Sequence, residues 1–535
     1  MKAKNLLILS LFFVLLTSLA SCARRGTPEG GPKDITPPSI TSSVPDNNTI
    51  NFNAEKIRIN FDEYIKLKDL QKQLIVSPPL EYQPYIYPQS GASKYLEIEI
   101  VDTLKENTTY VFNFGQSVVD NNEANPYSFF KYVFSTGDYI DSLELEGFVF
   151  DALQKKPENF ISVMLYEVDT AYTDSVIYQK PPTYITNTLD SSTNFRLTNL
   201  KEGTYKLVAM KDEAGNYKFD PKTDKIGYID HFIKIPSDSI YGLNLFKEIP
   251  AYKAGRPSLI AKNKIFFGYE GDPEGMEIKL LTEKPADYDY RIFPDMETDT
   301  LNYFFTPFEA DSLVFEVRKQ EVIDTFTVRV KELYPDTLVV AQLNKSFELN
   351  DSLKLHTSTP MENLNNEKIS VMDKDSTALE FDTNLDRKKN ILNIHWETQP
   401  DQKYRVTMLP GAITDFYGEE SDTLTYGVST KSLADLGSIR ITLNNVEKYP
   451  VILQLTDNKG EVLYEQFIKE SKYGYEFRNI NPATYLIRVI HDDNGNGKWD
   501  TGNYLKKIQP ERISYYPDPV ELRANWEIEQ TFNLQ

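Results

Sequence analysis

The stretch Lys56-Ile-Arg-Ile-Asn-Phe-Asp62 decides the fold class, because apolar and polar residues alternate along it. In an extended strand, Ile57, Ile59 and Phe61 point to one face and the residues between them point to the other. The pattern therefore predicts a β-strand with one buried face and one face in water.

Similar runs recur along the whole chain. They include Leu143-Glu-Leu-Glu-Gly-Phe-Val-Phe150, Asp324-Thr-Phe-Thr-Val-Arg-Val330 and Ile391-Leu-Asn-Ile-His-Trp396. Residues 64–73 alone indicate a helical turn. Short strands separated by turn residues predict an all-β chain made of tandem β-sandwich domains.

The N-terminus carries an export signal. Lys2 and Lys4 precede an apolar stretch, residues 6–16, which is too short for a membrane-spanning helix of roughly 20 residues. Small residues then lead to a cysteine in Leu19-Ala20-Ser21-Cys22. This segment resembles the bacterial lipobox, which implies that the thiol of Cys22 takes a diacylglycerol and becomes the new N-terminus.

Cys22 is the only cysteine in the chain, so lipid on this sulfur leaves no free thiol. We expect a lipoprotein signal peptide at residues 1–21, a flexible tether at residues 22–36 and a lipid anchor in the outer membrane. Lipoproteins that Bacteroidota send to the cell surface tend to carry acidic residues just after the cysteine. Arg24 and Arg25 stand there instead, so both the periplasmic and the external face stay open.

The acidic composition limits the partners. The chain has 58 Lys and Arg against 79 Asp and Glu, for a formal net charge of −21. Such a surface repels nucleic acid, so we expect no nucleic-acid partner. The 34 Tyr and 30 Phe suit half-buried strands.

Two kinds of segment occur twice. Asp120-Asn-Asn-Glu-Ala-Asn-Pro126, followed by Tyr132-Val-Phe-Ser-Thr136, has a counterpart in Asp415-Phe-Tyr-Gly-Glu-Glu-Ser421, followed by Tyr426-Gly-Val-Ser-Thr430. Gly203-Thr-Tyr205 precedes an Asp/Asn-rich loop, as does Ala483-Thr-Tyr485. The repeats predict two domain types, A and B, in the order A-B, a middle segment, then A-B.

The residues of each type resemble a known family. Type A, with Pro37-Pro38, the strand at 57–62 and Val133-Phe-Ser-Thr-Gly137, resembles the SbsA-type bacterial Ig-like domain of S-layer and surface proteins. Type B resembles the transthyretin-like or carboxypeptidase-regulatory sandwich through Gly203-Thr-Tyr-Lys-Leu207. Together with Gly30-Gly-Pro-Lys-Asp34 behind the lipobox, the order resembles that of Ig-like outer-membrane lipoproteins of Bacteroidota.

This organisation predicts five exported domains. They are an Ig-like domain at 37–137, a transthyretin-like sandwich at 138–250, a middle β domain at 251–341, a diverged second Ig-like domain at 342–432 and a second transthyretin-like sandwich at 433–535.

One loop has the spacing of a calcium site. Asp492, Asn494, Asn496 and Asp500 stand at positions one, three, five and nine, with Gly497 at position six, and such oxygens can converge on one Ca²⁺ ion. The twelfth position holds Asn in place of the glutamate of an EF-hand. The alternative is a metal-free turn between two strands.

Asp followed by Ser or Thr is frequent, and it resembles the O-glycosylation sequon of exported Bacteroidota proteins. This resemblance implies glycans on Thr103, Ser142, Thr300 and Ser312. The alternative is structural, because these pairs also start turns.

Signals of catalysis are scarce. The four histidines lie far apart, and neither an HExxH motif nor a Gly-x-Ser-x-Gly elbow is present. We therefore expect no enzyme. Tyr82, Tyr85 and Tyr87 either stack on sugars or pack in the core or at the edge of a sheet.

Two functions fit these features. The favoured one is a non-catalytic lipoprotein that presents β-sandwich modules to envelope protein partners. The resemblance implies a more specific role as an accessory subunit of the machinery for outer-membrane protein or surface-lipoprotein biogenesis. The alternative is a glycan-binding or adhesive cell-surface protein.

Overall fold

The computed structural model describes residues 33–156, 158–188, 192–344 and 346–534. Its described residues form two compact units, one up to Leu143 together with Asn199–Lys201, and the other within Glu144–Thr198 together with those from Glu202 onward. Strands hold 48% of the residues and helices 3%, which confirms the prediction of an all-β chain of tandem sandwiches. Within the described ranges, no helix combines the length and the apolar character needed to cross a bilayer.

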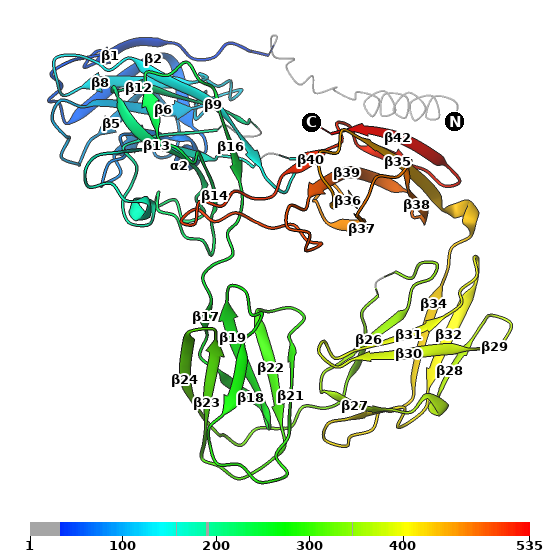
Figure 1. The fold of residues 1–535 in the computed structure, drawn as a ribbon. Coiled ribbons are helices and arrows are strands. Elements are labelled where there is room, and N and C mark those ends of the chain that lie inside the picture. The colour runs from blue at the N-terminus through cyan, green and yellow to red at the C-terminus, as the bar shows by residue number, and fades with distance from the viewer. Residues whose placement is uncertain (1–32, 157, 189–191, 345, 535) are drawn as a thin grey trace, which may run out of the picture. The chain divides into compact units, whose positions relative to one another are not determined.

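The first unit is one sandwich of two antiparallel sheets (Figure 1). One sheet has the order β1-β2-β5-β4, with β7 on β2, and the other has the order β3-β6-β8. Residues 64–67 continue β2, and the expected helical turn is the short α2 that follows. The elements are β1 (Ile40–Val44), β2 (Lys56–Leu67), α2 (Leu70–Gln73), β3 (Ile75–Ser77), β4 (Tyr85–Tyr87), β5 (Ser93–Glu99), β6 (Thr109–Gly115), β7 (Val118–Asp120) and β8 (Phe130–Ser135).

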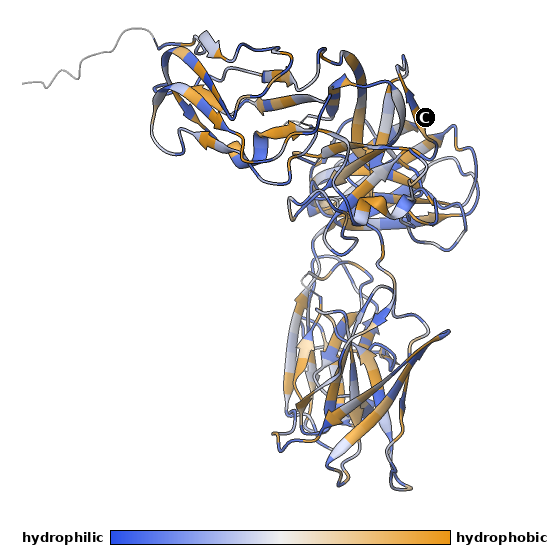
Figure 2. Ribbon diagram, turned by 90° about the vertical axis from the view of Figure 1, so that its left-hand side faces the viewer, coloured by the Kyte–Doolittle hydropathy of each residue, from blue (hydrophilic) through white to orange (hydrophobic). Residues whose placement is uncertain are grey.

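Alternation explains how this sandwich closes. Ile57 and Ile59 are fully buried, whereas Lys56 and Arg58, which alternate with them, face water. Figure 2 shows the same banding of hydrophobic and hydrophilic residues along strands throughout the chain. Because the period of the pleat is two, each sheet contributes one apolar face to a shared core.

The two segments of type B have the same strand order. In the first, the sheets are β12-β9-β16 and β11-β10-β13-β14, with β15 on β13; in the second, they are β38-β35-β42 and β37-β36-β39-β40, with β41 on β39. In both, the first strand pairs in parallel with the last. The first segment comprises β9 (Leu143–Asp151), β10 (Ser162–Glu167), η1 (Asp174–Tyr178), β11 (Tyr184–Asn187), β12 (Asn194–Leu200), β13 (Gly203–Lys211), β14 (Lys225–Tyr228), β15 (Ile233–Ile235) and β16 (Tyr241–Leu245).

The second type B segment begins with a short 3-10 turn. Its core gathers the apolar side chains of both sheets, among them Ile439, Leu453 and Ile487, all fully buried. Its elements are η3 (Leu433–Asp435), β35 (Gly437–Asn444), β36 (Val451–Thr456), β37 (Val462–Ile468), β38 (Tyr475–Ile480), β39 (Ala483–His491), β40 (Ile513–Tyr515), β41 (Val520–Leu522) and β42 (Glu527–Asn533).

The middle segment is also a sandwich, with sheets β17-β19-β22-β21, β18 on β19, and β20-β23-β24 (Figure 1). Its core is aromatic, with Phe267 packed edge-on against Phe315 at 5.1 Å between ring centroids. The strands are β17 (Lys253–Ala254), β18 (Ser258–Ala261), β19 (Lys264–Glu270), β20 (Glu277–Leu280), β21 (Tyr290–Pro294), β22 (Thr300–Phe305), β23 (Ser312–Lys319) and β24 (Val322–Arg329).

The second type A segment shares local structure with the first. The backbone N–H of Gln399 donates to the hydroxyl of Tyr404, as the N–H of Lys105 does to that of Tyr110. Its elements are β25 (Val340–Gln342), β26 (Leu353–Thr357), β27 (Met361–Leu364), η2 (Asn366–Lys368), β28 (Ile369–Met372), β29 (Ala378–Leu379), β30 (Phe381–Asp386), β31 (Ile391–Trp396), β32 (Lys403–Met408), β33 (Ile413–Asp415) and β34 (Leu424–Ser429).

Side chains join the sandwiches of the second unit. Tyr504, on the loop between β39 and β40, lies edge-on against Tyr228 of β14 at 5.1 Å between ring centroids. Tyr504 is 2% exposed, and its backbone N–H donates to the carboxylate of Glu248. Segments more than 250 residues apart in the sequence therefore pack together within this unit.

Candidate functional site

The predicted lipidation residue, Cys22, lies outside the described residues. Lipidation at this position stays a prediction of the sequence.

The four predicted glycosylation residues differ in exposure. Thr103 and Ser142 are exposed in coil segments, whereas Thr300 and Ser312 are half-buried at the first positions of β22 and β23. The Thr300 hydroxyl also shares a hydrogen bond with that of Thr298, at 2.9 Å. Thr103 and Ser142 are consequently the more accessible of the four to a transferase.

The loop predicted to hold calcium is a closed turn after β39. Asp492 is 1% exposed, and its two carboxylate oxygens accept hydrogen bonds from the N–H groups of Gly495 and Gly497, both at 2.8 Å. The side-chain amides of Asn494 and Asn496 both donate to Oδ2 of Asp500. The structure thus brings all four predicted residues into one loop.

The sequence pattern did not identify Glu511, which completes this loop. Its carboxylate accepts from the N–H groups of Asp493 and Asp500, at 2.9 and 3.0 Å. Burial raises the pKa of the Glu511 carboxyl, and the nearby charges of Asp500 and Asp492 add to this increase. No signal in the loop motif pointed to Glu511, because it lies on a later segment than any EF-hand position.

The side chains of the 492–500 loop and of Glu511 carry carboxylate and amide oxygens, which are the ligands that Ca²⁺ prefers. In the loop as described, however, each oxygen of Asp492 already accepts an N–H group, and both amides present nitrogen to Asp500. Within the described residues, no group of three or more His, Cys, Asp or Glu is placed to hold a metal ion. Calcium binding here remains a prediction.

The equivalent loop of the first type B segment has the same scaffold. Asp212 accepts from the N–H groups of Gly215 and Tyr217, at 2.7 and 2.6 Å. Asp224, which is fully buried, accepts from the N–H groups of Glu213 and Asp220 and thus fills the place of Glu511. The same kind of carboxylate-to-backbone hydrogen bonds thus organises both Asp-rich loops.

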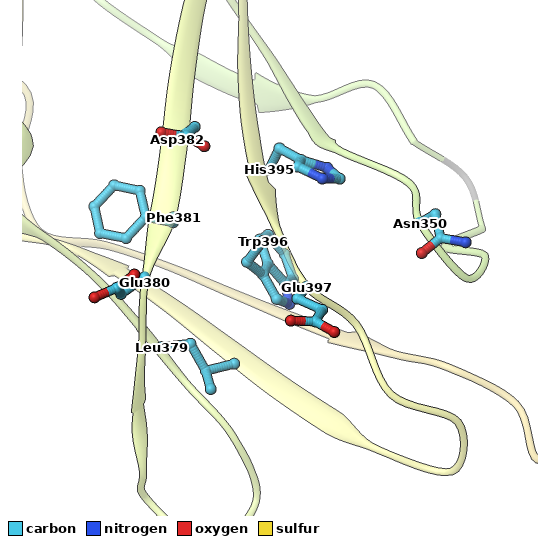
Figure 3. A pocket seen from close by; sticks show the side chains of 8 residues that line it. All are labelled: Asn350, Leu379, Glu380, Phe381, Asp382, His395, Trp396 and Glu397. Carbon is cyan, nitrogen blue, oxygen red and sulfur yellow. The ribbon is translucent and has the colours of Figure 1, made fainter.

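A hollow of about 610 Å³ lies beside β30 and β31 in the second type A segment (Figure 3). His395 and Asp382 are register partners on these two strands, and the His395 Nδ1 lies 3.4 Å from the Ser352 hydroxyl. In the part of the chain that the structure describes, no ion pair joins His395 to Asp382.

The three tyrosines for which the sequence leaves sugar stacking and packing open are all exposed. Tyr82, Tyr85 and Tyr87 have exposed fractions of 60%, 61% and 45%, so core packing does not account for them. Tyr85 and Tyr87 lie on the outer face of the β1-β2-β5-β4 sheet, opposite the buried Ile86.

Comparisons with known proteins support the Ig-like fold. Residues 34–136 match the family model of the bacterial Ig-like domain. No curated protein matches the chain by sequence.

Solved structures of other multi-domain β proteins align with the chain. The S-layer protein rSbsC aligns at 11% identity over 91% of this chain and 68% of its own, with a TM-score of 0.16. BcpA, the major pilin subunit of Bacillus cereus, aligns at 10% identity over 74% of this chain and 100% of its own, with a TM-score of 0.13. Dscam aligns at 9% identity over 70% of this chain and 99% of its own, with a TM-score of 0.16. At such low sequence identities and TM-scores, the functions of these proteins cannot be assigned to this chain.

Proposed function

We propose that the protein is a non-catalytic outer-membrane lipoprotein, anchored through Cys22, that presents its β-sandwich modules to other proteins of the cell envelope. The resemblance to Ig-like lipoproteins of Bacteroidota suggests a more specific role. In that role the protein is an accessory subunit of the machinery that assembles outer-membrane proteins or exports surface lipoproteins.

The observation that carries this proposal is how side chains join the sandwiches of the second unit. The guanidinium of Arg291 in the middle sandwich donates twice to the carboxylate of Glu362 in the next one, both times at 3.1 Å. The Tyr464 hydroxyl of the last sandwich donates to Glu348 at 2.7 Å.

Hydrogen bonds between neighbouring sandwiches restrict how far these sandwiches move relative to one another. Surfaces that are ordered before binding lose less conformational freedom when a partner binds. A scaffold of this kind suits a subunit that docks other proteins, and it needs no reactive group.

The same proposal includes the domain organisation and the glycan acceptors that the sequence predicts. The domains follow the boundaries 37–137, 138–250, 251–341, 342–432 and 433–535, with transthyretin-like sandwiches second and last. Thr103 and Ser142 are the preferred glycan acceptors, because both are exposed.

Affinity purification from native envelopes tests the proposal. The full chain with a C-terminal tag is extracted in mild detergent, and the co-purifying proteins are identified and quantified by mass spectrometry. We expect an outer-membrane barrel or transporter in a near one-to-one ratio.

A Cys22→Ser variant is the matched control. Without the thiol it takes no lipid, so it should leave the membrane fraction. Repeated recovery of the lipidated chain with no protein bound would contradict the proposed docking role.

A further inference from the structure

One face of the first sandwich carries an ordered set of aromatic and polar side chains. It is the outer face of β2, β5 and β4, where alternation turns Ile57, Leu96 and Ile86 into the core. The residues between these apolar positions therefore point outward. Across the strands, Tyr87 is the register partner of Glu97, and Glu97 of Arg58.

Three tyrosines line a hollow of about 540 Å³ on this face. The rings of Tyr87 and Tyr95 stack with centroids 5.2 Å apart and an interplanar angle of 26°. The Arg58 guanidinium lies 3.7 Å from the centroid of the Tyr95 ring, and Tyr85 stands two residues before Tyr87 on the same side of β4. This stack holds Tyr95 and Tyr87 in place and leaves ring surface open at Tyr85 and Tyr87.

Polar groups surround these rings. Gln89, Ser90, Glu97 and Glu99 line the same hollow. Their amide, hydroxyl and carboxylate groups provide hydrogen-bond donors and acceptors next to aromatic faces. An apolar surface with a few such convergent groups is the usual composition of a small-molecule site.

The charges beside the hollow are balanced. Lys56 lies 3.1 Å from Glu99 and 3.6 Å from Glu97, and Arg58 is engaged by Tyr95. Beside the hollow, two basic side chains, Lys56 and Arg58, thus offset the charge of two acidic ones, Glu97 and Glu99. A charged ligand would find no complementary excess here, so the face favours a neutral ligand.

The edge strand of the sheet is poorly suited to pair with a peptide strand as a ligand. The edge strand β4 has three residues, and Pro84 and Pro88 stand directly on either side of it. Proline offers no backbone N–H, and short edges with proline resist the pairing of a further strand. A ligand that lies on the face, rather than along the edge, fits these features.

We propose that the outer face of β2, β5 and β4 is a binding site for a neutral hexose oligosaccharide. The apolar C–H faces of successive sugar rings would stack on Tyr85 and Tyr87, which are about 7 Å apart along the strand. The sugar hydroxyls would bond to Gln89, Ser90 and Glu97. This site is independent of the proposed docking of envelope proteins.

Isothermal titration calorimetry of the full chain tests the site, with maltohexaose, cellohexaose and mannohexaose as probes. We expect at least one probe to bind. Tyr85→Ala and Tyr87→Ala should each weaken that binding about tenfold, which corresponds to about 1.4 kcal/mol. Tyr87→Phe keeps the ring and should retain most of the affinity.

The matched control is Tyr139→Ala. Tyr139 is 51% exposed in the same unit and is not one of the residues that line the hollow, so its loss should leave binding unchanged. Thermal unfolding of each variant verifies that it is folded, which we expect because these side chains are exposed.

Three results would overturn the site: no heat with any of the three probes, binding that survives the Tyr85 and Tyr87 substitutions, or binding of a charged hexauronate alone. None of these results depends on whether an envelope protein co-purifies with the chain, so the two proposals are tested separately.

Discussion

Asp120 shows how one carboxylate can organise a loop. It ends β7 and is 2% exposed. Its Oδ1 accepts from the N–H groups of Asn122, Glu123 and Ala124, and its Oδ2 from that of Asn125, at distances of 2.7 to 3.1 Å. Burial opposes ionisation, but these four donors outweigh it and lower the pKa of Asp120.

We predict that Asp120→Asn destabilises the first unit by about 1 to 3 kcal/mol at neutral pH, because the amide replaces an acceptor with a donor that faces N–H groups. A depressed carboxyl pKa stabilises the fold above the unfolded value of about 4, and this contribution is lost as the pH falls through the folded pKa. The difference between the proteins should therefore shrink below pH 4.

Urea unfolding of the full chain at several pH values measures this effect. Asp138→Asn is the control, because Asp138 is an exposed carboxylate in the same unit. An equal loss of stability in both variants, or a difference that grows below pH 4, would contradict the role given to Asp120.

At the scale of elements, Gly147 sets how closely two strands approach. It lies in β9 opposite Tyr241 of β16, in a parallel pair. A Cβ atom on Gly147 would overlap the carbonyl oxygen of Tyr241 and lie 2.5 Å from Cζ of Phe195. Phe195 is 4% exposed, so it has little room to move.

We predict that Gly147→Ala destabilises the second unit by about 1 to 3 kcal/mol, the usual effect of added volume in a packed site. Gly242→Ala, on the partner strand, should have little effect, because no atom lies within 4 Å of its added Cβ. Thermal unfolding of the two variants compares them directly. Equal unfolding midpoints for the two variants would show that the strands accommodate the added methyl group at Gly147 without loss of stability, and would contradict this prediction.

The elements also show what local pattern can reveal. The alternation in Leu143-Glu-Leu-Glu-Gly-Phe-Val-Phe150 indicates a strand, and β9 occupies Leu143–Asp151. The same pattern cannot identify β16 as its parallel partner, because that pairing joins residues about 90 positions apart. The candidate sites behave alike: the residues of the 492–500 loop are visible in the sequence, but Glu511 is not.

For the whole molecule, the contact of Tyr504 with Tyr228 joins the two type B sandwiches within the second unit. Neighbouring bonds support it: Gln509 donates to the carbonyl of Tyr228 at 3.2 Å, and the Thr501 hydroxyl donates to the carbonyl of Lys247 at 2.6 Å. The contact is aromatic at its centre and polar around it, as in many stable interfaces.

We predict that Tyr504→Ala loosens this contact, because it removes the buried ring from the centre of the interface. Hydrogen exchange followed by mass spectrometry should show faster exchange at the N–H of Tyr504 and in the neighbouring residues of its loop. Leu505→Ala is the control, since Leu505 is 54% exposed. Unchanged protection in Tyr504→Ala would mean that the sandwiches are held by other contacts.

The sequence by itself determined the all-β class, the Ig-like character of the first domain and the residues of the Asp-rich loops. The all-β class and the loops depend on period-two alternation and on turn residues, which act over a few neighbouring positions, whereas the Ig-like character comes from the resemblance of residues 37–137 to a known family. Only the tertiary structure decided that Tyr85 and Tyr87 are exposed beside Tyr95, that Glu511 closes the 492–500 loop and that Tyr504 packs on Tyr228. Such contacts join distant segments, and their free energy comes from packing and hydrogen bonds that no local pattern encodes.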